Sequence, residues 1–401
     1  MAGKVVTLFG GRWFEMLRMT WDPVHPIMLQ DPDSVYRELR AHCPVARTDY
    51  LGGMWGIFRY DNIVKAARDT ATFANGARPR YPHMRRIPLE TDPPEHTSYR
   101  RLVLPFFSAE RMNRLEPAVR SIAAELIEPL IGRGRVDIAQ SLTYPLPVRA
   151  VCAWLNLPDE DWDKILYWSE ELFASSWGKD PERSKAAETA LAEYCRQKVD
   201  ERRRSPHPPG TDVIADLLAA RIDGKPLEEI LIIGALHLML TAGHDSTTSS
   251  IGIIIKYLAD HPDVENLLRS RPELIPNAAE EILRLETPVQ MSRRTVTRDT
   301  EFGGQMLTKG DRVFLVWGSG NRDESVFGQP DKFDPARSPN LHLTFGFGVH
   351  KCVGAPLARL EIRVAIGELL QRTSRIEPAG PAVRTGNPRF GISSLPVILH
   401  P

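Results

Sequence analysis

The feature that most constrains the fold is one very long helical pattern, from Pro226 to Asp260. Pro226 suits the first helical position, and His261-Pro262 ends the pattern. At ~1.5 Å per residue, such a helix is on the order of 50 Å long, the width of a whole domain. It is apolar nearly all round before residue 241, which predicts a central, buried helix.

The middle of this pattern is polar, with the run Ala242-Gly243-His244-Asp245-Ser246-Thr247. Polar groups on a buried helix must find partners or line a cavity. Gly243 weakens the helix but lets another group approach its backbone. The run therefore indicates a site on the helix. The alternative is a helix kink that polar side chains cap.

The other patterns predict a mainly α protein with a minor β component. There is no internal repeat and no shift in composition, so we predict one domain over residues 1–401, with residues 1–30 as an irregular N-terminal segment. The clearest segments are helices at Arg111–Ile131 and Pro181–Arg204, strands at Met54–Arg59 and Arg312–Trp317, and loops at Arg78–Pro94 and Ser205–Gly210.

Bulk composition excludes several classes of protein. Lys+Arg and Asp+Glu both number 51, which argues against a general nucleic-acid binder. The four cysteines form no C-x-x-C pair, so neither a disulfide framework nor a zinc cluster is indicated. The first residues lack the apolar stretch of a signal peptide, and the apolar run Ile230–Leu240 is too short to span a bilayer. We therefore expect a cytoplasmic protein that binds neither membrane nor nucleic acid.

The strongest chemical signal is the run Phe345-Gly346-Phe347-Gly348-Val349-His350-Lys351-Cys352-Val353-Gly354. Its three glycines indicate a tight loop, and apolar residues at helical spacing follow it. Cys352 thus lies just before a helix N-terminus, where backbone N–H groups can stabilise a thiolate. The other cysteines lack this setting, and we expect them to be small buried hydrophobic residues.

At these positions the sequence resembles the cytochrome P-450 family. The haem-binding loop of that family reads F-x-x-G-x-[HR]-x-C-x-G, and every fixed position matches, at Phe345, Gly348, His350, Cys352 and Gly354. The resemblance implies haem b (iron protoporphyrin IX) with Cys352 as the axial iron ligand. It also implies the family's single-domain fold, with the haem buried between the long central helix and the helix after the Cys352 loop.

The polar run on the long helix resembles the family's oxygen-activating segment, [AG]-G-x-[DE]-T-[TS]. The resemblance assigns Ala242 to the haem contact and makes Asp245 and Ser246 the catalytic acid and alcohol, which relay protons during oxygen activation. The family usually has threonine where Ser246 stands. Because serine keeps the hydroxyl but loses the methyl that fixes its rotamer, we expect turnover with more reduced oxygen released as peroxide.

Other matches extend the resemblance to nearly the whole chain. Glu281 and Arg284 match the family's E-x-x-R pair, and Phe333–Arg337 resembles the segment whose arginine joins that pair. The resemblance gives them a structural role behind the haem. Asp92–Arg100 resembles the D-P-P-x-H-x-x-x-R opening of a helix. The resemblance therefore assigns haem contacts, including the propionates, to these residues: His96, Arg100, Arg294, Phe345 and His350.

The resemblance implies a ferredoxin-dependent monooxygenase that hydroxylates or otherwise oxidises a small hydrophobic substrate with O2, and we expect a monomer. Electrons would come from a ferredoxin and its reductase. Four basic residues could form a docking face for these proteins, or they could be scattered surface charge, and both readings are equally open: Arg101, Lys351, Arg359 and Arg363. A compact terpenoid or aromatic compound is the expected substrate. Gln290, Ser292, Ser393 and Ser394 are candidates to hydrogen-bond it, and a loop arginine could hold a carboxylate.

Two alternatives keep the haem but not this activity. One is a thiolate-haem isomerase, dehydratase or peroxygenase, and the other is a haem sensor without enzymatic activity. The acid–alcohol pair Asp245 and Ser246 argues against both, because neither needs that proton relay.

Overall fold

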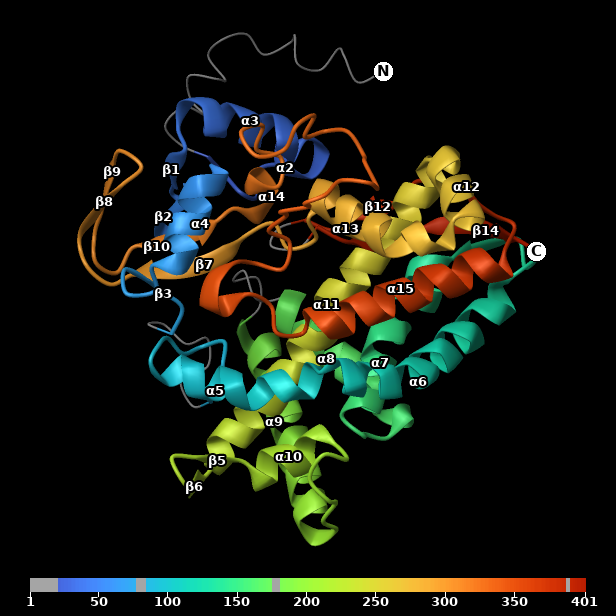
Figure 1. The fold of residues 1–401 in the computed structure, drawn as a ribbon, viewed down its shortest axis with the longest axis horizontal. Helices are drawn as coiled ribbons and strands as arrows, with labels where there is room; N and C mark the ends of the chain where they lie inside the picture. The colour runs from blue at the N-terminus through green and yellow to red at the C-terminus, as the bar shows by residue number, and fades with distance from the viewer. Residues whose placement is uncertain (1–20, 77–83, 175–180, 387–389) are drawn as a thin grey trace. The chain divides into compact units, whose positions relative to one another are not determined.

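The computed structural model describes residues 21–76, 84–174, 181–386 and 390–401 (Figure 1). As predicted, the described residues are mainly helical, with several small sheets. They pack into two compact units. The first unit comprises residues 21–76, 283–351, 385–386 and 390, and the second comprises residues 84–174, 181–282, 352–384 and 391–401. The single domain over residues 1–401 stays a prediction.

The first unit contains a five-stranded mixed sheet with an apolar core. Its strands, in spatial order, are β1 (Val45–Thr48), β2 (Met54–Ile57), β10 (Arg312–Leu315), β7 (Ser292–Val296) and β3 (Phe73–Ala74). β10 runs parallel to β2, and the other neighbours are antiparallel. Ile57, Ile63, Phe73, Val313 and Trp317 pack together in its core. The remaining elements are the hairpin of β8 (Thr300–Phe302) and β9 (Gln305–Leu307), and the helices α2 (Ile27–Gln30), α3 (Pro32–His42), α4 (Tyr60–Arg68) and α14 (Trp317–Gly320).

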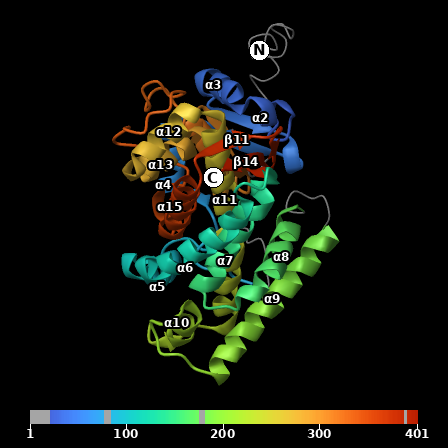
Figure 2. The same ribbon diagram turned by 90° about the vertical axis from the view of Figure 1, so that its right-hand side faces the viewer.

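The second unit consists mainly of helices. α8 (Trp162–Ala174) and α9 (Pro181–Arg204) lie side by side (Figure 2). α15 (Ala355–Arg372) packs on α6 (Ala109–Ile127) and on α11 (Glu229–Asp260), which also packs on α7 (Pro145–Trp154). The other helices are α5 (Glu95–Val103), α10 (Val213–Ala219), α12 (Pro262–Ser270) and α13 (Ile275–Glu286), which continues into the first unit. The strands are β4 (Arg135–Asp137), β5 (Arg221–Ile222), β6 (Lys225–Pro226), β11 (Arg375–Pro378), β12 (Val383–Arg384), β13 (Ile392–Ser394) and β14 (Pro396–His400).

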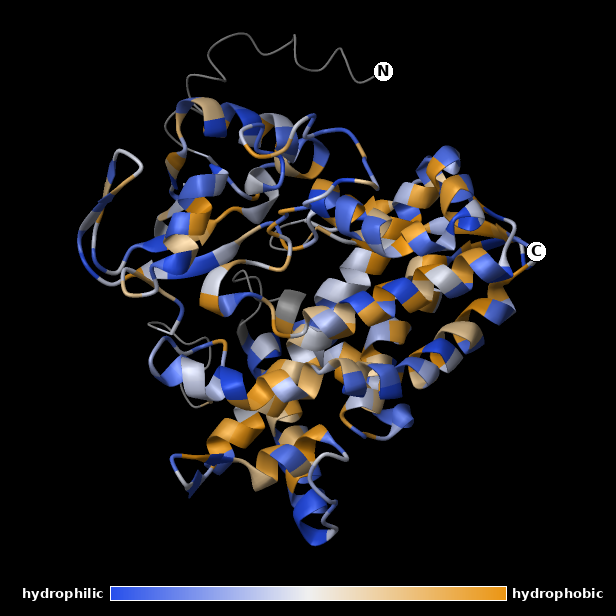
Figure 3. Cartoon of the chain, viewed as in Figure 1, coloured by the Kyte–Doolittle hydropathy of each residue, from blue (hydrophilic) through white to orange (hydrophobic). Residues whose placement is uncertain are grey.

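The long helix α11 is buried over most of its length, as the sequence predicts. Figure 3 shows the half of α11 near α10 as strongly hydrophobic. The predicted start at Pro226 is wrong, because Pro226 pairs with Arg221 in the β5–β6 hairpin. Asp223 and Gly224 at its tip have positive φ angles of 52° and 77°, the backbone of a tight hairpin turn. The helix therefore begins only at Glu229, and it ends at Asp260 as predicted.

Most of the other expected elements are present with small shifts. The helix predicted at Pro181–Arg204 is confirmed, and residues 205–210 form the predicted loop. Residues 84–94 contain neither helix nor strand, and residues 78–83 of that predicted loop lie outside the described residues. The segment 1–30 is not wholly irregular, because α2 begins at Ile27. Trp21 is also buried, against Phe58 and Phe314.

In the part of the chain that the structure describes, no helix is both long and apolar enough to cross a bilayer.

Candidate functional site

In the first unit, the Cys352 loop begins with two glycines in the left-handed region. Gly346 and Gly348 have φ angles of +70° and +73°. A β-carbon at Gly348 would lie 2.5 Å from the carbonyl oxygen of Ala67, at the end of α4, whereas one at Gly346 would meet nothing closer than 3.8 Å. Arg68 lies over the ring of Phe347, 5.0 Å from its centroid. Position 348 therefore requires glycine for two reasons, its positive φ angle and the close packing against Ala67.

A buried asparagine fixes the chain just before this loop. The Oδ1 of Asn321 accepts a hydrogen bond from the Leu343 N–H, and its Nδ2 donates to the hydroxyls of Thr287 and Thr344. Thr344 in turn donates to the carbonyl of Leu283 at 2.9 Å. Because Asn321 is fully buried, losing one of these partners would leave an unsatisfied polar group. The approach to Phe345 is thus held by a closed polar network.

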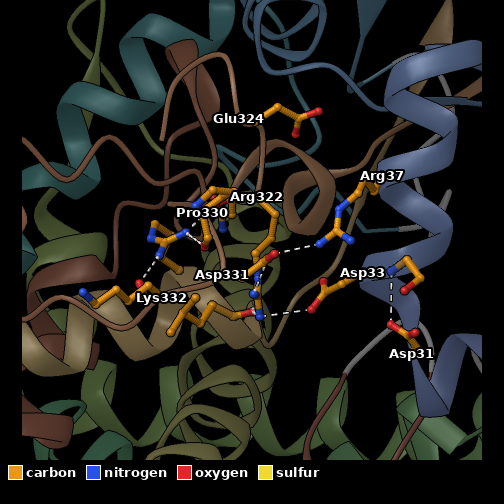
Figure 4. A network of polar contacts seen from close by, with 12 residues as sticks. Asp31, Asp33, Arg37, Arg322, Glu324, Pro330, Asp331 and Lys332 are labelled. Carbon is orange, nitrogen blue, oxygen red and sulfur yellow. Dashed lines mark hydrogen bonds and ion pairs between the residues drawn. The ribbon is translucent and has the colours of Figure 1, made fainter. Parts of the chain in front are cut away.

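Ion pairs hold the neighbouring stretch around Arg322 against α3. Arg322 contacts Asp33 at 3.0 Å and Asp331 at 2.8 Å, and Arg37 contacts Asp331 at 2.7 Å (Figure 4). Burial is the largest cause acting on the pKa of Asp33 and raises it, while Arg322 opposes that shift. This network lies entirely within the first unit and stabilises the segment that leads to the loop.

Two arginines share a structural role. Arg284 belongs to the E-x-x-R pair, and Arg337 ends the segment whose arginine joins that pair in the family. Arg284 is fully buried and donates to the carbonyls of Asn321 and Pro330 at 2.9 and 2.7 Å. Both guanidinium groups lie over the ring of Phe327, at 5.0 and 5.9 Å from its centroid. Glu281 is also fully buried, and its pairing with the arginines stays a prediction.

Cys352 lies where the sequence places it, just before α15 in the second unit. The backbone N–H groups of Gly354 and Ala355 donate to its sulfur, and the charges of Arg100 and Arg359 act on it. These four groups lower the pKa of the thiol. Desolvation by the surrounding protein atoms is the largest cause, and it leaves that pKa raised. The sequence patterns did not predict that Arg359 acts on this sulfur, although its position in the second turn of α15 could have indicated it.

The four cysteines, all within the described residues, differ in access. Cys352 is exposed, Cys43 is half-buried, and Cys152 and Cys195 are buried. Burial raises the pKa of Cys152 to about 12 and also raises that of Cys195. The expectation of small buried residues is confirmed for Cys152 and Cys195. Cys352 alone among the four is an exposed residue, and its sulfur receives N–H groups from a helix start.

His96 and Arg100 lie on α5, one helical turn apart as predicted. His96 is 2% exposed and Arg100 is half-buried. Burial is the largest cause acting on the pKa of Arg100 and lowers it, while the charge of Cys352 opposes this shift. The structure thus brings Arg100 within electrostatic range of the candidate ligand.

The other predicted contact residues lie in the first unit. Arg294, on β7, is buried and donates to the Oδ1 of Asn75 at 3.3 Å and to the carbonyl of Arg293 at 2.8 Å. Phe345 is half-buried, with its ring centroid 6.0 Å from that of His342. His350 is half-buried in the short helical turn Gly348–His350.

Asp245 and Ser246 lie on an accessible face of α11. Both are half-buried, and Ala242, one turn earlier, is exposed. The helix continues through this run without a break, and the alternative of a capped kink stays open. Thr247 donates back to the carbonyl of Gly243 at 3.4 Å, but the Ser246 hydroxyl makes no hydrogen bond to another described residue. Ser246 is therefore available to bind water or a ligand.

Comparison with known proteins shows which family the chain belongs to. The model of the family described as cytochrome P450 matches residues 148–271 and 268–381. The chain belongs to the cytochrome P450 family. Linalool 8-monooxygenase of Pseudomonas putida is 34% identical over 93% of this chain and 96% of that protein. Mycinamicin IV hydroxylase/epoxidase of Micromonospora griseorubida is 35% identical over 88% and 89%.

Solved P450 structures agree with the fold. The cytochrome P450 CYP109Q5 of Chondromyces apiculatus matches with a TM-score of 0.87 and 30% identity, over 96% of this chain and 99% of that one. CYP108D1 of Novosphingobium aromaticivorans gives a TM-score of 0.85 and 31% identity, over 96% and 98%. The chain therefore has the P450 fold and is a P450 monooxygenase whose cofactor is haem b, which the family binds through a cysteine thiolate.

The residues present fit that cofactor. Haem in this family needs one thiolate donor, and the chain offers one exposed cysteine, Cys352, with backbone N–H groups aimed at its sulfur. Arg100 adds a cation nearby for an anionic group. The donor chemistry is therefore that of a thiolate-ligated haem.

The candidate hydrogen-bonding residues for a P450 substrate each make a hydrogen bond within the protein, although the side-chain oxygen of Gln290 has no partner among the described residues. Ser292 accepts a hydrogen bond from Trp317 at 2.9 Å, and the Gln290 amide donates to the carbonyls of Glu286 and Thr287. The Ser393 hydroxyl donates to the Val383 carbonyl, and the Ser394 hydroxyl donates to Asp137. The two described arginines of the loop, Arg85 and Arg86, pair with Glu95 and Glu90. Arg78 and Arg80 lie outside the described residues.

Two of the four basic residues of the possible docking face have acidic partners that neutralise their charge. Arg359 pairs with Glu280 at 2.7 Å, and Arg363 pairs with Glu116 at 2.7 Å. The same contacts lower the pKa of Glu116 to about 2, with the hydrogen bond from Arg363 as the largest cause. These two arginines therefore serve mainly to join helices.

Proposed function

We propose that Cys352 is the axial thiolate ligand through which this P450 monooxygenase holds its haem. The single observation that supports this is the exposed residue Cys352, whose sulfur receives the N–H groups of Gly354 and Ala355 at the start of α15. The haem supplies dioxygen activation with two externally supplied electrons, and electron donation from the thiolate favours O–O cleavage. The N–H groups of Gly354 and Ala355 would favour the charged form of the sulfur and limit that donation.

The test is a spectrum of the reduced, carbon-monoxide-bound protein. Wild-type protein should give the band of thiolate-ligated haem. Cys352→Ala should lose it completely, while Cys43→Ala should keep it, because Cys43 has no N–H donors from a helix start. A thiolate band that persists in Cys352→Ala would contradict the proposal.

Several side chains are proposed to hold and surround the cofactor. Arg100 and His96 on α5, with Arg294 on β7 and His350 in the loop, supply the cationic and N–H groups that two propionates need. Phe345 of the loop and Ala242 of α11 are proposed to contact the ring. His96 and Arg294 are both buried, which supports this, because buried polar side chains in proteins normally have a hydrogen-bonding partner.

Asp245 and Ser246 are proposed to deliver protons during turnover. The Ser246 hydroxyl, which makes no hydrogen bond to another described residue, can hold a water molecule and pass a proton to it. Asp245, on the same accessible face, is proposed to renew that proton from solvent. The isomerase and sensor alternatives need no such relay, and the similar proteins are named as a monooxygenase and a hydroxylase/epoxidase.

The substrate is proposed to be a small neutral hydrophobic compound, of the terpenoid or aromatic kind. Its recognition would rest mainly on shape and apolar burial, because most of the candidate polar groups in the described residues already have partners within the protein. The likeness to linalool 8-monooxygenase favours a compact terpenoid.

Matched pairs of ligands test this substrate class. A terpenoid alcohol should shift the haem spectrum at a concentration at least about tenfold lower than the corresponding carboxylate, because a carboxylate would be buried without a partner. Equal or tighter binding of the carboxylates would overturn it. Product that carries oxygen from labelled O2, only when a reductant is supplied, would separate monooxygenase from peroxygenase.

Electrons are proposed to come from a ferredoxin with its reductase. Arg101 and Lys351 are exposed and remain available as docking cations. The monomeric state and the cytoplasmic location stay predictions.

A further inference from the structure

The face of α11 that carries Asp245 and Ser246 is accessible only over part of its length. Residues at spacings of three, four or seven lie on one face of a helix, and Leu238, Ala242 and Asp245 are related in this way. Leu238 and Asp245 are half-buried and Ala242 is exposed, whereas residues 231–237 before them are buried. This accessible face therefore begins at Leu238.

A glycine four residues earlier on the same face marks where it is covered. A β-carbon at Gly234 would lie 2.0 Å from the carbonyl oxygen of Arg85 and 2.7 Å from its carbonyl carbon. The backbone of the segment 84–90 therefore rests directly on α11 at Gly234, closer than any side chain would permit. Gly252, five turns further along the same face, is covered in turn by Ile392 of β13, 3.4 Å from its β-carbon position.

The segment 84–90 is fixed by its own contacts as well as by the glycine. Met84 and Ile87, on either side of Arg85, are almost fully buried. The ion pair between Arg86 and Glu90 is largely buried, with N–O distances of 2.5 and 3.1 Å. Arg85 itself binds Glu95 of α5 at 2.6 and 2.9 Å. The segment 84–90 is therefore held firmly in place and forms a wall over this part of α11.

We propose that this wall closes one end of the substrate-binding face of α11, and that Gly234 is a specificity-determining residue which limits substrate length. The inference rests on the proposed function, since it takes the accessible face of α11 as the substrate side. Leu238 lies only one turn, ~6 Å, from Gly234. A substrate that reaches from Ser246 past Leu238 therefore meets the Arg85 backbone.

A methyl group at position 234 should push the segment 84–90 away from α11. In Gly234→Ala, the carbonyl of Arg85 must retreat from 2.0 Å to an ordinary contact distance. That displacement opens the end of the face and weakens the contacts of the segment. Gly367→Ala on α15 is the matched control, because a β-carbon there meets nothing within 4 Å.

The probe is a series of n-alkylimidazoles, whose ring nitrogen binds haem iron whatever the natural substrate is. In wild-type protein and in Gly367→Ala, affinity should rise about fourfold per methylene, the gain from burying one CH2, and fall beyond a limiting length. In Gly234→Ala, the rise should continue to longer chains. Backbone hydrogen exchange of residues 86–90 should also be several-fold faster in that variant.

A second variant keeps the test decisive if Gly234→Ala does not fold. Glu90→Gln removes the charge from the buried pair with Arg86 and leaves α11 untouched, so it should move the length limit in the same direction. An unchanged limit and unchanged exchange in the folded variants would overturn the inference. If no imidazole shifts the wild-type spectrum, the haem proposal fails instead. The exchange measurement then still decides whether Gly234 seats the wall, because it needs no haem.

Discussion

The Cys352 loop and the polar run of α11 carry the two halves of the proposed chemistry, but they are built in different ways. The loop has irregular backbone, with left-handed glycines and a close contact to Ala67, and Asn321 fixes its approach. The run on α11 is regular helix, with Asp245 and Ser246 on an accessible face. Substitution in the loop should therefore unfold or displace the site, whereas substitution on the helix should tune the reaction at little cost in stability.

Gly348→Ala should give the largest effect, and Gly346→Ala separates its causes. Both substitutions place a side chain at a positive φ, which costs about 1–2 kcal/mol. Only Gly348→Ala also drives a methyl group against the Ala67 backbone, so its total loss should exceed ~3 kcal/mol. Denaturant unfolding of both variants measures the difference. Equal losses would show that close packing at Ala67 contributes nothing.

Asp245→Asn should lower the rate of product formation by about 100-fold, the contribution of a positioned acid. Its unfolding free energy should fall by less than that of Gly348→Ala, because a regular helix accepts asparagine without backbone strain. Asp260→Asn, at the far end of the same helix and paired there with Lys256, is the control and should keep full activity. A large stability loss in Asp245→Asn would break the contrast between loop and helix.

Glu361, on the helix that follows the loop, should make stability depend on pH. It is fully buried, neither carboxylate oxygen has a hydrogen-bond partner among the described residues, and burial raises its pKa well above 4.5. Because the folded pKa is the higher one, stability is fully present below the unfolded pKa and falls as pH rises from there through the folded pKa.

Glu361→Gln should remove that fall, because an amide does not ionise, and it should be more stable than wild type above the folded pKa of Glu361. Glu368→Gln is the contrast, since it breaks pairs with Arg120 and Arg372 and should destabilise. Denaturant midpoints measured from pH 5 to 8 would show both effects. Parallel curves for wild type and Glu361→Gln would contradict the prediction.

Ser246→Thr should have the smallest effect, a decrease of a few-fold in the peroxide released per electron pair consumed. The added methyl restricts the hydroxyl to fewer rotamers. Thr247→Ser is the control, because Thr247 already bonds back to Gly243 and should not affect peroxide release. Equal peroxide yields in wild type and Ser246→Thr would mean that hydroxyl orientation does not control coupling.

Much of this site could be predicted because its signals are local. A cysteine between a glycine-rich loop and a helix can be recognised in ten residues, and so can an acid–alcohol pair on a buried helix. The start of α11 could not be predicted, because Pro226 suits a first helical turn and a hairpin strand equally well. Pairing with Arg221 decided between them. The ion pairs of Arg359 and Arg363 could not be predicted either, because their acidic partners come from distant helices.

By itself, the sequence determined the family, the cofactor that the family binds and the helix face on which Asp245 and Ser246 lie, because motif spacing and helical period are encoded within short segments. Only the tertiary structure decided which polar groups remain available to a ligand and where the accessible face of α11 ends. Those properties depend on contacts between residues far apart in the chain, such as Arg85 with Gly234 and Ser292 with Trp317. No local pattern records them.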